Sequence, residues 1–391
     1  MATRRNPNGN RGGRVSNAST HTAPTSSSHG PVIKSPAAKT MRKKRNASAA
    51  TQNDSVNDDG TQIETLPMEK TTHSAVRSRM KRAERSTDAG GDQYDKQLAA
   101  FARETVKTGV QKLVKDFNEA RAAMPKNIPK TAFERNPDKN RYKDVLCIDE
   151  TRVVLRWPET TTNDYIHANW VQVRGEKRYI CTQGPTAKTV EDFWRMVVQE
   201  KAKGIVMLTE VMELGKKKCE QYWPRINGES LEYAYMTVKN VGVTEVERMI
   251  LSTRLEITTV SGEKMTCEHI LWSGWPDRSV PDNFLATLRL VRKIAPLTPC
   301  IVHCSAGIGR TGTIVGLDMA QRAMQAGEAV NMHDIVKELR KYRHGSVQTD
   351  IQFVFMHAVL LRLADNRKAT TKDTVKPFFD QYNQFVQSRG G

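Results

Sequence analysis

Residues 1–92 contain no Phe, Trp or Tyr, and their apolar residues are scattered singly among Ser, Thr, Asn, Gly and basic side chains. Such a segment cannot bury enough apolar surface to offset the entropy that is lost when its backbone is ordered. The sequence therefore predicts a disordered basic tail over residues 1–92. Patterned runs of Trp, Phe, Val, Ile and Leu begin near Tyr94 and are extensive enough for one large core.

The chain also lacks the patterns that are typical of metal-binding, secreted and membrane-spanning proteins. None of its six cysteines forms a Cys-x-x-Cys pair, which disfavours a zinc site or a thioredoxin-like site. The N-terminus has no apolar stretch of the kind that a secretory signal needs. No run approaches the roughly 18 apolar residues of a membrane span. Because unpaired thiols suit a reducing compartment, we expect a cytoplasmic protein without receptor architecture, with the nucleus as the alternative location.

The charge balance is strongly basic, with 61 Lys and Arg against 43 Asp and Glu and a formal net charge of +18. An excess of this size favours acidic partners, namely phosphorylated or acidic substrates, a membrane surface or nucleic acid. Within the tail, residues 42–45 and 79–82 are candidate basic patches for nucleic acid or membrane binding. Charge runs are more often only solubilising or localising segments, so both alternatives stay open.

The hydrophobic pattern predicts a folded α+β domain over residues 93–370, followed by a short C-terminal helix or tail over residues 371–391. Apolar spacing predicts an amphipathic helix over 95–117, and alternation of apolar with polar residues predicts antiparallel strands over 231–260. Strands early in the domain and helices late in it are typical of a mixed sheet flanked by helices. Further strands are predicted at 151–157, 165–171, 178–183, 204–209, 268–272 and 300–304, and helices at 191–202, 283–294, 310–326, 333–343, 350–365 and 377–387.

Residues 300–313 carry the clearest chemical pattern. An apolar strand runs into Cys304, and five residues with two glycines separate this cysteine from Arg310, where a helix begins. Gly307 and Gly309 let successive backbone N–H groups point inward as an anion nest, and the positive end of the helix adds to it. Arg310 can close this cup with a two-pronged contact to phosphate that lysine cannot copy. The same positive field stabilises a thiolate, so Cys304 is the candidate nucleophile.

This stretch resembles the His-Cys-x5-Arg-Ser/Thr signature of the cysteine-dependent phosphatases, in the form that is typical of the protein tyrosine phosphatases. The resemblance implies a protein-tyrosine-phosphatase-like fold with a highly twisted mixed sheet, and makes residues 93–370 the catalytic domain. It implies hydrolysis of phosphotyrosine on proteins through a phosphocysteine at Cys304. Arg310 would then bind the substrate and transition state, Thr311 would hydrogen-bond the sulfur, and His303 would tune the thiol. The phosphate would lie against Ser305, Ala306, Gly307, Ile308 and Gly309.

The tripeptide Trp-Pro-Asp at 275–277 is the candidate acid loop. A departing phenolate needs a proton, which a positioned aspartate can supply. Pro-Asp pairs are also common in ordinary turns. However, Asp277 lies 27 residues before Cys304, where the resembled family keeps its mobile acid loop. Asp277 would be acid in the first step and base in the second. Arg278 follows where the family usually has an aromatic residue or His, and Trp272 replaces a Tyr.

Residues 139–144 resemble the family's phosphotyrosine-recognition loop, although in isolation they would suggest only a basic loop before a strand. By this resemblance Tyr142 would form the wall of a deep pocket. The phosphate of phosphotyrosine would reach Cys304 at its base, whereas that of the shorter phosphoserine would not. Asp144 would hold the backbone of the substrate peptide.

Residues 348–352 resemble the family's Gln-Thr-x-x-Gln stretch, in which two carboxamides hold the water that hydrolyses phosphocysteine. Gln352 is the main candidate, with Gln348 assisting. Glu213 would orient Arg310 by a charge-assisted pair, and Lys218 would approach the acid loop. The other supporting residues that the resemblance implies are Arg340 beside the cradle and Trp275 in the acid loop.

No metal or organic cofactor is expected, because cysteine, arginine and aspartate supply the chemistry. A phosphotyrosine-binding pseudophosphatase is one alternative, but such proteins typically lose the nucleophile, the arginine or the acid, and all three are present here. A dual-specificity phosphatase is another, but that class lacks the Tyr142 loop and the Trp-Pro-Asp context.

Overall fold

The computed structural model describes residues 73–125 and 127–389, with side chains described from residue 91 onward. Most of the predicted tail, including the basic patch at 42–45, therefore lies outside the described residues. The second patch, at 79–82, falls in a helix whose side chains are likewise outside the description.

Helix α1 (His73–Ala122) begins inside the segment that the sequence assigns to the tail, so residues 73–92 are helical and not irregular. The backbone leaves the helical conformation at Gly109, with φ of 71° and ψ of 163°, which glycine tolerates because it has no Cβ. The second half of the helix packs on the core, where Phe117 stacks on Phe353 with ring centroids 5.0 Å apart. The amphipathic helix predicted over 95–117 is thus confirmed.

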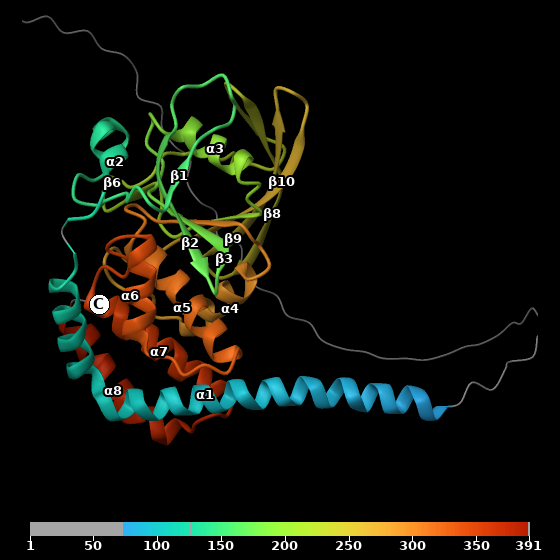
Figure 1. The fold of residues 1–391 in the computed structure, drawn as a ribbon, viewed down its shortest axis with the longest axis vertical. Helices are drawn as coiled ribbons and strands as arrows, with labels where there is room; N and C mark the ends of the chain where they lie inside the picture. The colour runs from blue at the N-terminus through green and yellow to red at the C-terminus, as the bar shows by residue number, and fades with distance from the viewer. Residues whose placement is uncertain (1–72, 126, 390–391) are drawn as a thin grey trace, which may run out of the picture. The chain divides into compact units, whose positions relative to one another are not determined.

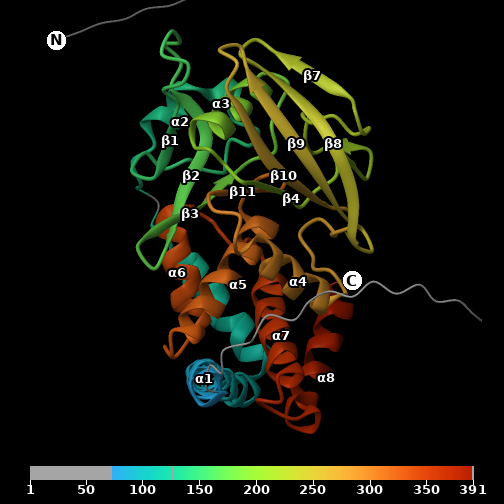
Figure 2. The same cartoon turned by 90° about the vertical axis from the view of Figure 1, so that its right-hand side faces the viewer.

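A nine-stranded mixed sheet forms the centre of the fold (Figures 1 and 2). In spatial order, its strands are β1 (Arg152–Val154), β2 (Tyr165–Val173), β3 (Glu176–Thr182), β11 (Cys300–His303), β4 (Gly204–Met207), β10 (Lys264–Trp272), β9 (Ile250–Thr259), β8 (Met236–Glu247) and β7 (Ser230–Tyr233).

The central strands of the sheet run parallel, and the outer ones run antiparallel. Strand β11 pairs in parallel with β3 on one side and β4 on the other, and β4 pairs in parallel with β10. Side chains of β11 alternate between two separate cores, with Val302 in the larger one and Ile301 in the smaller one. Burial on both faces explains why the sequence shows an uninterrupted apolar run here.

The larger core lies between the sheet and the C-terminal helices, which Figure 2 shows gathered below the sheet. The smaller core lies between the opposite face and helix α3.

The remaining elements are α2 (Thr131–Arg135), the 3-10 helix η1 (Pro137–Lys139), α3 (Val190–Gln199), β5 (Met212–Glu213), β6 (Lys216–Lys217), α4 (Phe284–Ile294), α5 (Gly309–Gln325), α6 (Met332–Tyr342), α7 (Asp350–Asn366) and α8 (Lys372–Ser388).

The predicted fold class, a twisted mixed sheet flanked by helices, is confirmed. Each predicted strand and helix is present, but β1 covers only 152–154 of the predicted 151–157, and β10 starts four residues before its predicted start at 268. The short α2, η1 and the β5–β6 hairpin were not predicted, because they span too few residues for a hydrophobic period to be recognised. Within residues 73–125 and 127–389, none of the helices combines the length and apolarity that a membrane span requires.

Helix α8 differs most from its prediction. It starts five residues before the predicted Pro377 and carries that proline inside its first turns. The predicted domain boundary at residue 370 set this helix apart, but Phe378 and Tyr382 are buried in the larger core. Gln381 accepts a hydrogen bond from the backbone N–H of Val110, at 3.0 Å. Helix α8 therefore belongs to the same folded unit as the sheet.

Candidate active site

Cys304 lies at the C-terminal end of the central strand β11, just before the start of helix α5, and only 5% of its surface is exposed. The backbone N–H of Gly307 donates to Cys304 Sγ at 3.2 Å. Gly307 has a φ of 72°, and a Cβ there would lie 2.0 Å from the carbonyl oxygen of Thr182, so no other residue fits. The turn after Cys304 therefore curls around the sulfur, as the sequence predicts.

A buried arginine that the sequence did not single out holds the outer side of this cradle. Arg343 is fully buried and donates to the carbonyl oxygens of Gly307 and Ala306, both at 3.1 Å. It also donates to Asn169 Oδ1 at 2.7 Å and lies 3.1 Å from His167 Nδ1. Because these carbonyl groups are engaged on the outside, the N–H groups of the turn are left to face an anion.

Arg340, which the sequence places beside the cradle, holds the adjoining segment. Its guanidinium donates to the carbonyl oxygens of Ser346 at 3.0 Å and Val347 at 3.1 Å. The backbone N–H of Val347 in turn donates to the carbonyl oxygen of Ile308 at 2.9 Å. Arg340 thus supports the cradle indirectly, whereas Arg343 contacts it.

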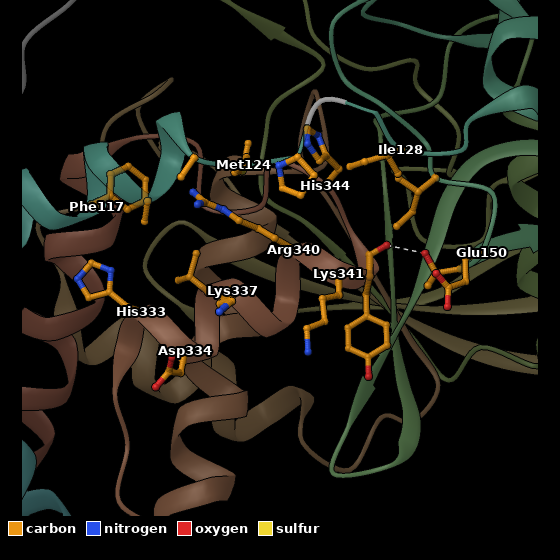
Figure 3. Close-up of a pocket in the computed structure, with 17 residues that line it drawn as sticks. Phe117, Met124, Ile128, Glu150, His333, Asp334, Lys337, Arg340, Lys341 and His344 are labelled. Carbon is orange, nitrogen blue, oxygen red and sulfur yellow. Dashed lines mark hydrogen bonds between the residues drawn. The ribbon is translucent and has the colours of Figure 1, made fainter.

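Arg340 also lines a cavity of about 840 Å³ between the end of α1 and helix α6 (Figure 3). Its guanidinium lies 5.2 Å from the ring centroid of Phe117, and Figure 3 shows it beside Met124 and His344. Cys304 is not among the residues that line this cavity. The cavity is therefore separate from the candidate chemistry.

We expect Arg343→Met to lower the free energy of unfolding by about 3 kcal/mol or more, because it leaves several buried acceptors without a donor. Arg340→Met removes two bonds at a less buried position and should cost clearly less. Urea unfolding of the two variants measures both values. Equal losses would contradict the assignment of Arg343 as the main support of the cradle.

Arg310 and Glu213 form the charge-assisted pair that the resemblance to the family predicts, and they do so through two contacts. Arg310 Nη1 lies 2.6 Å from Glu213 Oε1, and Nη2 lies 2.9 Å from Oε2. Burial alone would raise the pKa of Glu213, but the hydrogen bonds and charge of Arg310 outweigh it and the pKa is lowered. An ionised Glu213 on β5 therefore fixes the guanidinium of Arg310, which is 3% exposed at the start of α5.

Asp277 lies over this pair, on the loop that follows β10. Its Oδ2 accepts from Lys218 Nζ at 2.6 Å, and its Oδ1 lies 3.4 Å from Arg310 Nη2. Burial would raise the pKa of Asp277, but the hydrogen bond and charge of Lys218, followed by the charges of Arg310 and Arg278, outweigh it and lower the pKa. The predicted acid and the predicted phosphate-binding arginine are thus brought together.

Two tryptophans anchor the base of the acid loop. Trp275 donates from Nε1 to the carbonyl oxygen of Ser279 at 3.1 Å, and this bond closes the loop on itself. Its ring meets that of Trp272 edge to face at 5.0 Å and that of Phe355 at 6.2 Å. Trp272, which replaces the family's usual Tyr, therefore serves as a packing surface for the loop.

Tyr142 reaches the cradle from the predicted recognition loop. Its hydroxyl lies 2.9 Å from Ser305 Oγ, which itself donates to the carbonyl oxygen of Lys218 at 3.0 Å. The neighbouring Arg141 fixes the loop by donating to the carbonyl oxygens of Gly184 and Pro185. Asp144 is exposed two residues further on. The loop therefore brings the hydroxyl of Tyr142 to Ser305 of the cradle, whereas Asp144 is exposed.

Gln348 and Gln352 lie against the first turn of α5. A Cβ built on Gly309 would come within 3.0 Å of Gln352 Nε2 and 3.2 Å of Gln348 Oε1. Gln352 Oε1 accepts from the backbone N–H of Gln348 at 3.1 Å and from that of Thr349 at 3.3 Å. Both predicted carboxamides are thus at the cradle, and the absence of a side chain at Gly309 allows this approach.

Thr311 does not form its predicted contact, whereas the predicted effect of His303 on the thiol stays a prediction; His303 Nδ1 lies 3.2 Å from the carbonyl oxygen of Cys304. Thr311 Oγ1 is buried and has no hydrogen-bond partner among the described residues, so the predicted bond to the sulfur is not formed in this structure. His303 Nε2 lies 2.7 Å from the hydroxyl of Tyr222, whose oxygen is also 2.8 Å from His269 Nε2. Burial lowers the pKa of His303 to about 4, so the ring is neutral. Sequence patterns gave no signal for this Tyr222–His269 contact, because its members come from separate segments.

The chain belongs to the protein-tyrosine phosphatase family. The model of that family matches residues 136–362, which is more than half of the chain and includes the cradle, the acid loop and the recognition loop. The family expected from the sequence motifs is thus confirmed.

Among curated relatives, rat tyrosine-protein phosphatase non-receptor type 20 is 33% identical over 261 residues, which cover 65% of this chain and 61% of the relative. Human receptor-type tyrosine-protein phosphatase H is 35% identical over 267 residues, which cover 66% of this chain and 24% of the relative. The chain thus spans less than two thirds of the length of these relatives. The solved catalytic domain of human protein tyrosine phosphatase non-receptor type 18 aligns with a TM-score of 0.63 at 30% identity, covering 68% of this chain and 99% of that domain.

Proposed function

We propose that this protein is a protein tyrosine phosphatase, a phosphoric monoester hydrolase that removes phosphate from phosphotyrosine on proteins through a phosphocysteine. The observation that carries the proposal is the convergence of three groups. Cys304 accepts an N–H bond from its own cradle, Arg310 lies in the first turn of the helix that follows this cradle, and Asp277 lies 3.4 Å from Arg310. These contacts support the assignment of Cys304 as nucleophile, Arg310 as anion-binding group and Asp277 as proton donor for one phosphoryl group.

In the first step, the inward N–H groups and Arg310 bind the phosphoryl oxygens, and Cys304 Sγ attacks phosphorus in line with the phenolic oxygen. The S–P bond forms as the P–O bond breaks, and Asp277 gives its proton to the departing tyrosine oxygen. The pKa of Asp277 is lowered in the empty site. A bound phosphate dianion neutralises Arg310 and repels the Asp277 carboxylate, so it raises that pKa toward the protonated form that catalysis needs.

In the second step, Gln352 and Gln348 hold a water against the phosphocysteine. The Asp277 carboxylate, which is now ionised, takes a proton from this water as its oxygen attacks phosphorus. The S–P bond breaks and Cys304 leaves as a thiolate, which the N–H of Gly307 stabilises. Glu213 keeps Arg310 in place through both steps.

The position of Tyr142 supports phosphotyrosine as the substrate. Its hydroxyl lies against Ser305 of the cradle, which supports a pocket wall that would keep the phosphate of a short phosphoserine side chain from reaching Cys304. A solved relative at 30% identity, the non-receptor type 18 phosphatase, is described in complex with phosphopeptides. The six cysteines are free, which suits the reducing cytoplasm as the site of action.

Hydrolysis of a phosphotyrosine peptide beside its phosphoserine twin tests the proposal. We expect phosphate release from the first peptide alone. Binding of the phosphotyrosine peptide without turnover would instead identify a phosphotyrosine-binding module, and equal hydrolysis of the two peptides would identify a dual-specificity enzyme.

We expect Lys218→Met to move the basic limb of the pH–rate profile to higher pH. Lys218 is the main cation that lowers the pKa of Asp277. Without it the pKa rises, so the acid stays protonated to a higher pH. The profile of kcat/KM on a phosphotyrosine peptide measures the shift, with Lys217→Met as a control, because Lys217 pairs with Glu220. A basic limb that stays in place or moves to lower pH would contradict this assignment.

A further inference from the structure

Arg278 occupies an unusual backbone conformation immediately after the proposed general acid. Its φ is 58°, in the left-handed region that residues with a Cβ rarely adopt. Its carbonyl oxygen accepts a hydrogen bond from Thr349 Oγ1 at 3.2 Å. Thr349 is also the N-cap of α7, the helix that carries Gln352. The backbone of Arg278 is therefore held against the part of the site that binds water.

The side chain of Arg278 is exposed and forms no ion pair with any side chain that the structure describes. Neighbouring cations are already engaged within the protein. Lys218 contacts Asp277, Arg310 contacts Glu213, and Arg141 is bound to two backbone carbonyl groups. Arg278 thus differs from them in having a guanidinium available to a partner outside the chain.

The place of Arg278 determines which part of a substrate it can meet. Asp277 must touch the phenolic oxygen of the phosphotyrosine when it gives up its proton. Adjacent Cα atoms are about 3.8 Å apart, so the side chain of Arg278 starts close to the residues that would flank this tyrosine in a bound peptide. Its positive charge also contributes to the lowered pKa of Asp277, after the contributions of Lys218 and Arg310.

We propose that Arg278 is a specificity-determining residue that binds the carboxylate of an Asp or Glu next to the phosphotyrosine. This inference rests on the proposed function and names its preferred substrates as acidic phosphotyrosine segments. The planar guanidinium matches a carboxylate with two parallel N–H···O bonds. The aromatic residue or His that the family usually has at this position cannot make that contact. The backbone of Arg278 is held by Thr349 while its side chain is exposed and available for this contact.

The test compares kcat/KM for phosphotyrosine peptides with Glu or Gln at the residues just before and after the tyrosine. We expect the wild type to prefer Glu by about two- to fivefold, as an exposed ion pair allows, and the ratio to approach one in about 0.5 M salt. Arg278→Gln should abolish the preference, and Arg278→Glu should reverse it in favour of Lys-flanked peptides. The matched control is Arg174→Gln, because Arg174 is also an exposed arginine with positive φ (55°), on the β2–β3 turn.

The proposal would be overturned if Arg278→Gln left the ratio of kcat/KM for Glu-flanked peptides to that for Gln-flanked peptides at its wild-type value. A change in the pH profile of Arg278→Gln with no change in that ratio would also overturn it, since Arg278 would then act only on Asp277. Binding of the same peptides to Cys304→Ser protein separates this inference from the proposed function. A preference for Glu peptides in binding, lost in the double variant with Arg278→Gln, would support the role of Arg278 even if the wild type hydrolysed none of them.

Discussion

Cys304→Ser is expected to abolish turnover of a phosphotyrosine peptide, lowering kcat by more than about 10⁴-fold. A serine hydroxyl remains protonated at neutral pH and is a much poorer nucleophile than a cysteine sulfur in the same position. Serine is also a poorer leaving group in the second step. Since the hydroxyl is no larger than the thiol, the chain should stay folded and still bind the peptide. Steady-state kinetics and equilibrium binding measure the two effects.

Cys267→Ala is the matched control. Cys267 is also a buried thiol, but it lies on β10 in the smaller core, on the face of the sheet away from the C-terminal helices. It should retain most of the wild-type kcat despite some loss of stability. Comparable losses of kcat in the two variants would show that thiols serve only the packing of this protein, and a Cys304→Ser protein with substantial activity would exclude the proposed nucleophile.

Asp277→Asn is expected to lower kcat on a phosphotyrosine peptide by about 10²- to 10⁴-fold. Asparagine keeps the size of the side chain and a carbonyl oxygen for Lys218, but it has no acidic proton to give to the phenolic oxygen. An aryl phosphate with a strongly acidic phenol as leaving group needs little protonation. The loss on such a substrate should therefore be much smaller when the first step limits the rate.

Asp282→Asn provides the control for the same loop, because Asp282 is exposed near its end and has no place in the proposed chemistry. It should be close to wild type on both substrates. If Asp277→Asn lowered kcat by the same factor on the peptide and on the activated aryl phosphate, Asp277 would serve to position other groups of the site and would not donate a proton.

The parts of the site that lie within one short segment could be predicted from the sequence. Cys304, the two glycines and Arg310 are contiguous, so the cradle follows from local backbone geometry and needs no knowledge of the fold. The pair between Arg310 and Glu213 joins residues that are far apart in the chain, and it was expected only because a second motif resembled the family. Its geometry then came from the hairpin of β5 and β6.

Contacts that depend on tertiary packing were missed. Arg340 and Arg343 lie three residues apart at the end of α6, and nothing in their spacing tells which one enters the core. The burial of Arg343 depends on strand β2, which supplies Asn169 and His167 as partners. Tyr222, His269 and His303 come from three separate segments, so their contact also depends on tertiary packing.

The fold was predictable wherever a long amphipathic period was present. The start of α1 was not, because residues 73–92 lack the aromatic residues that signalled a core. A helix that is anchored further along by packing can extend through such residues, since propagation costs much less than nucleation. Helix α8 is longer than the predicted 377–387, because it begins at Lys372 and carries Pro377 inside.

The most direct test of the central claim is detection of a phosphoryl group on the sulfur of Cys304 during turnover. Gln352→Ala should slow hydrolysis of the intermediate, because it removes a carboxamide that holds the attacking water. After a denaturing quench of this variant with a phosphotyrosine peptide, mass spectrometry should find one added phosphoryl group on the peptide that contains Cys304. The same experiment on the variant that also carries Cys304→Ser should find none. Turnover with the phosphoryl group on a residue other than Cys304 would contradict a phosphocysteine mechanism. Turnover with no phosphoenzyme and no initial burst of dephosphorylated tyrosine peptide would contradict it as well.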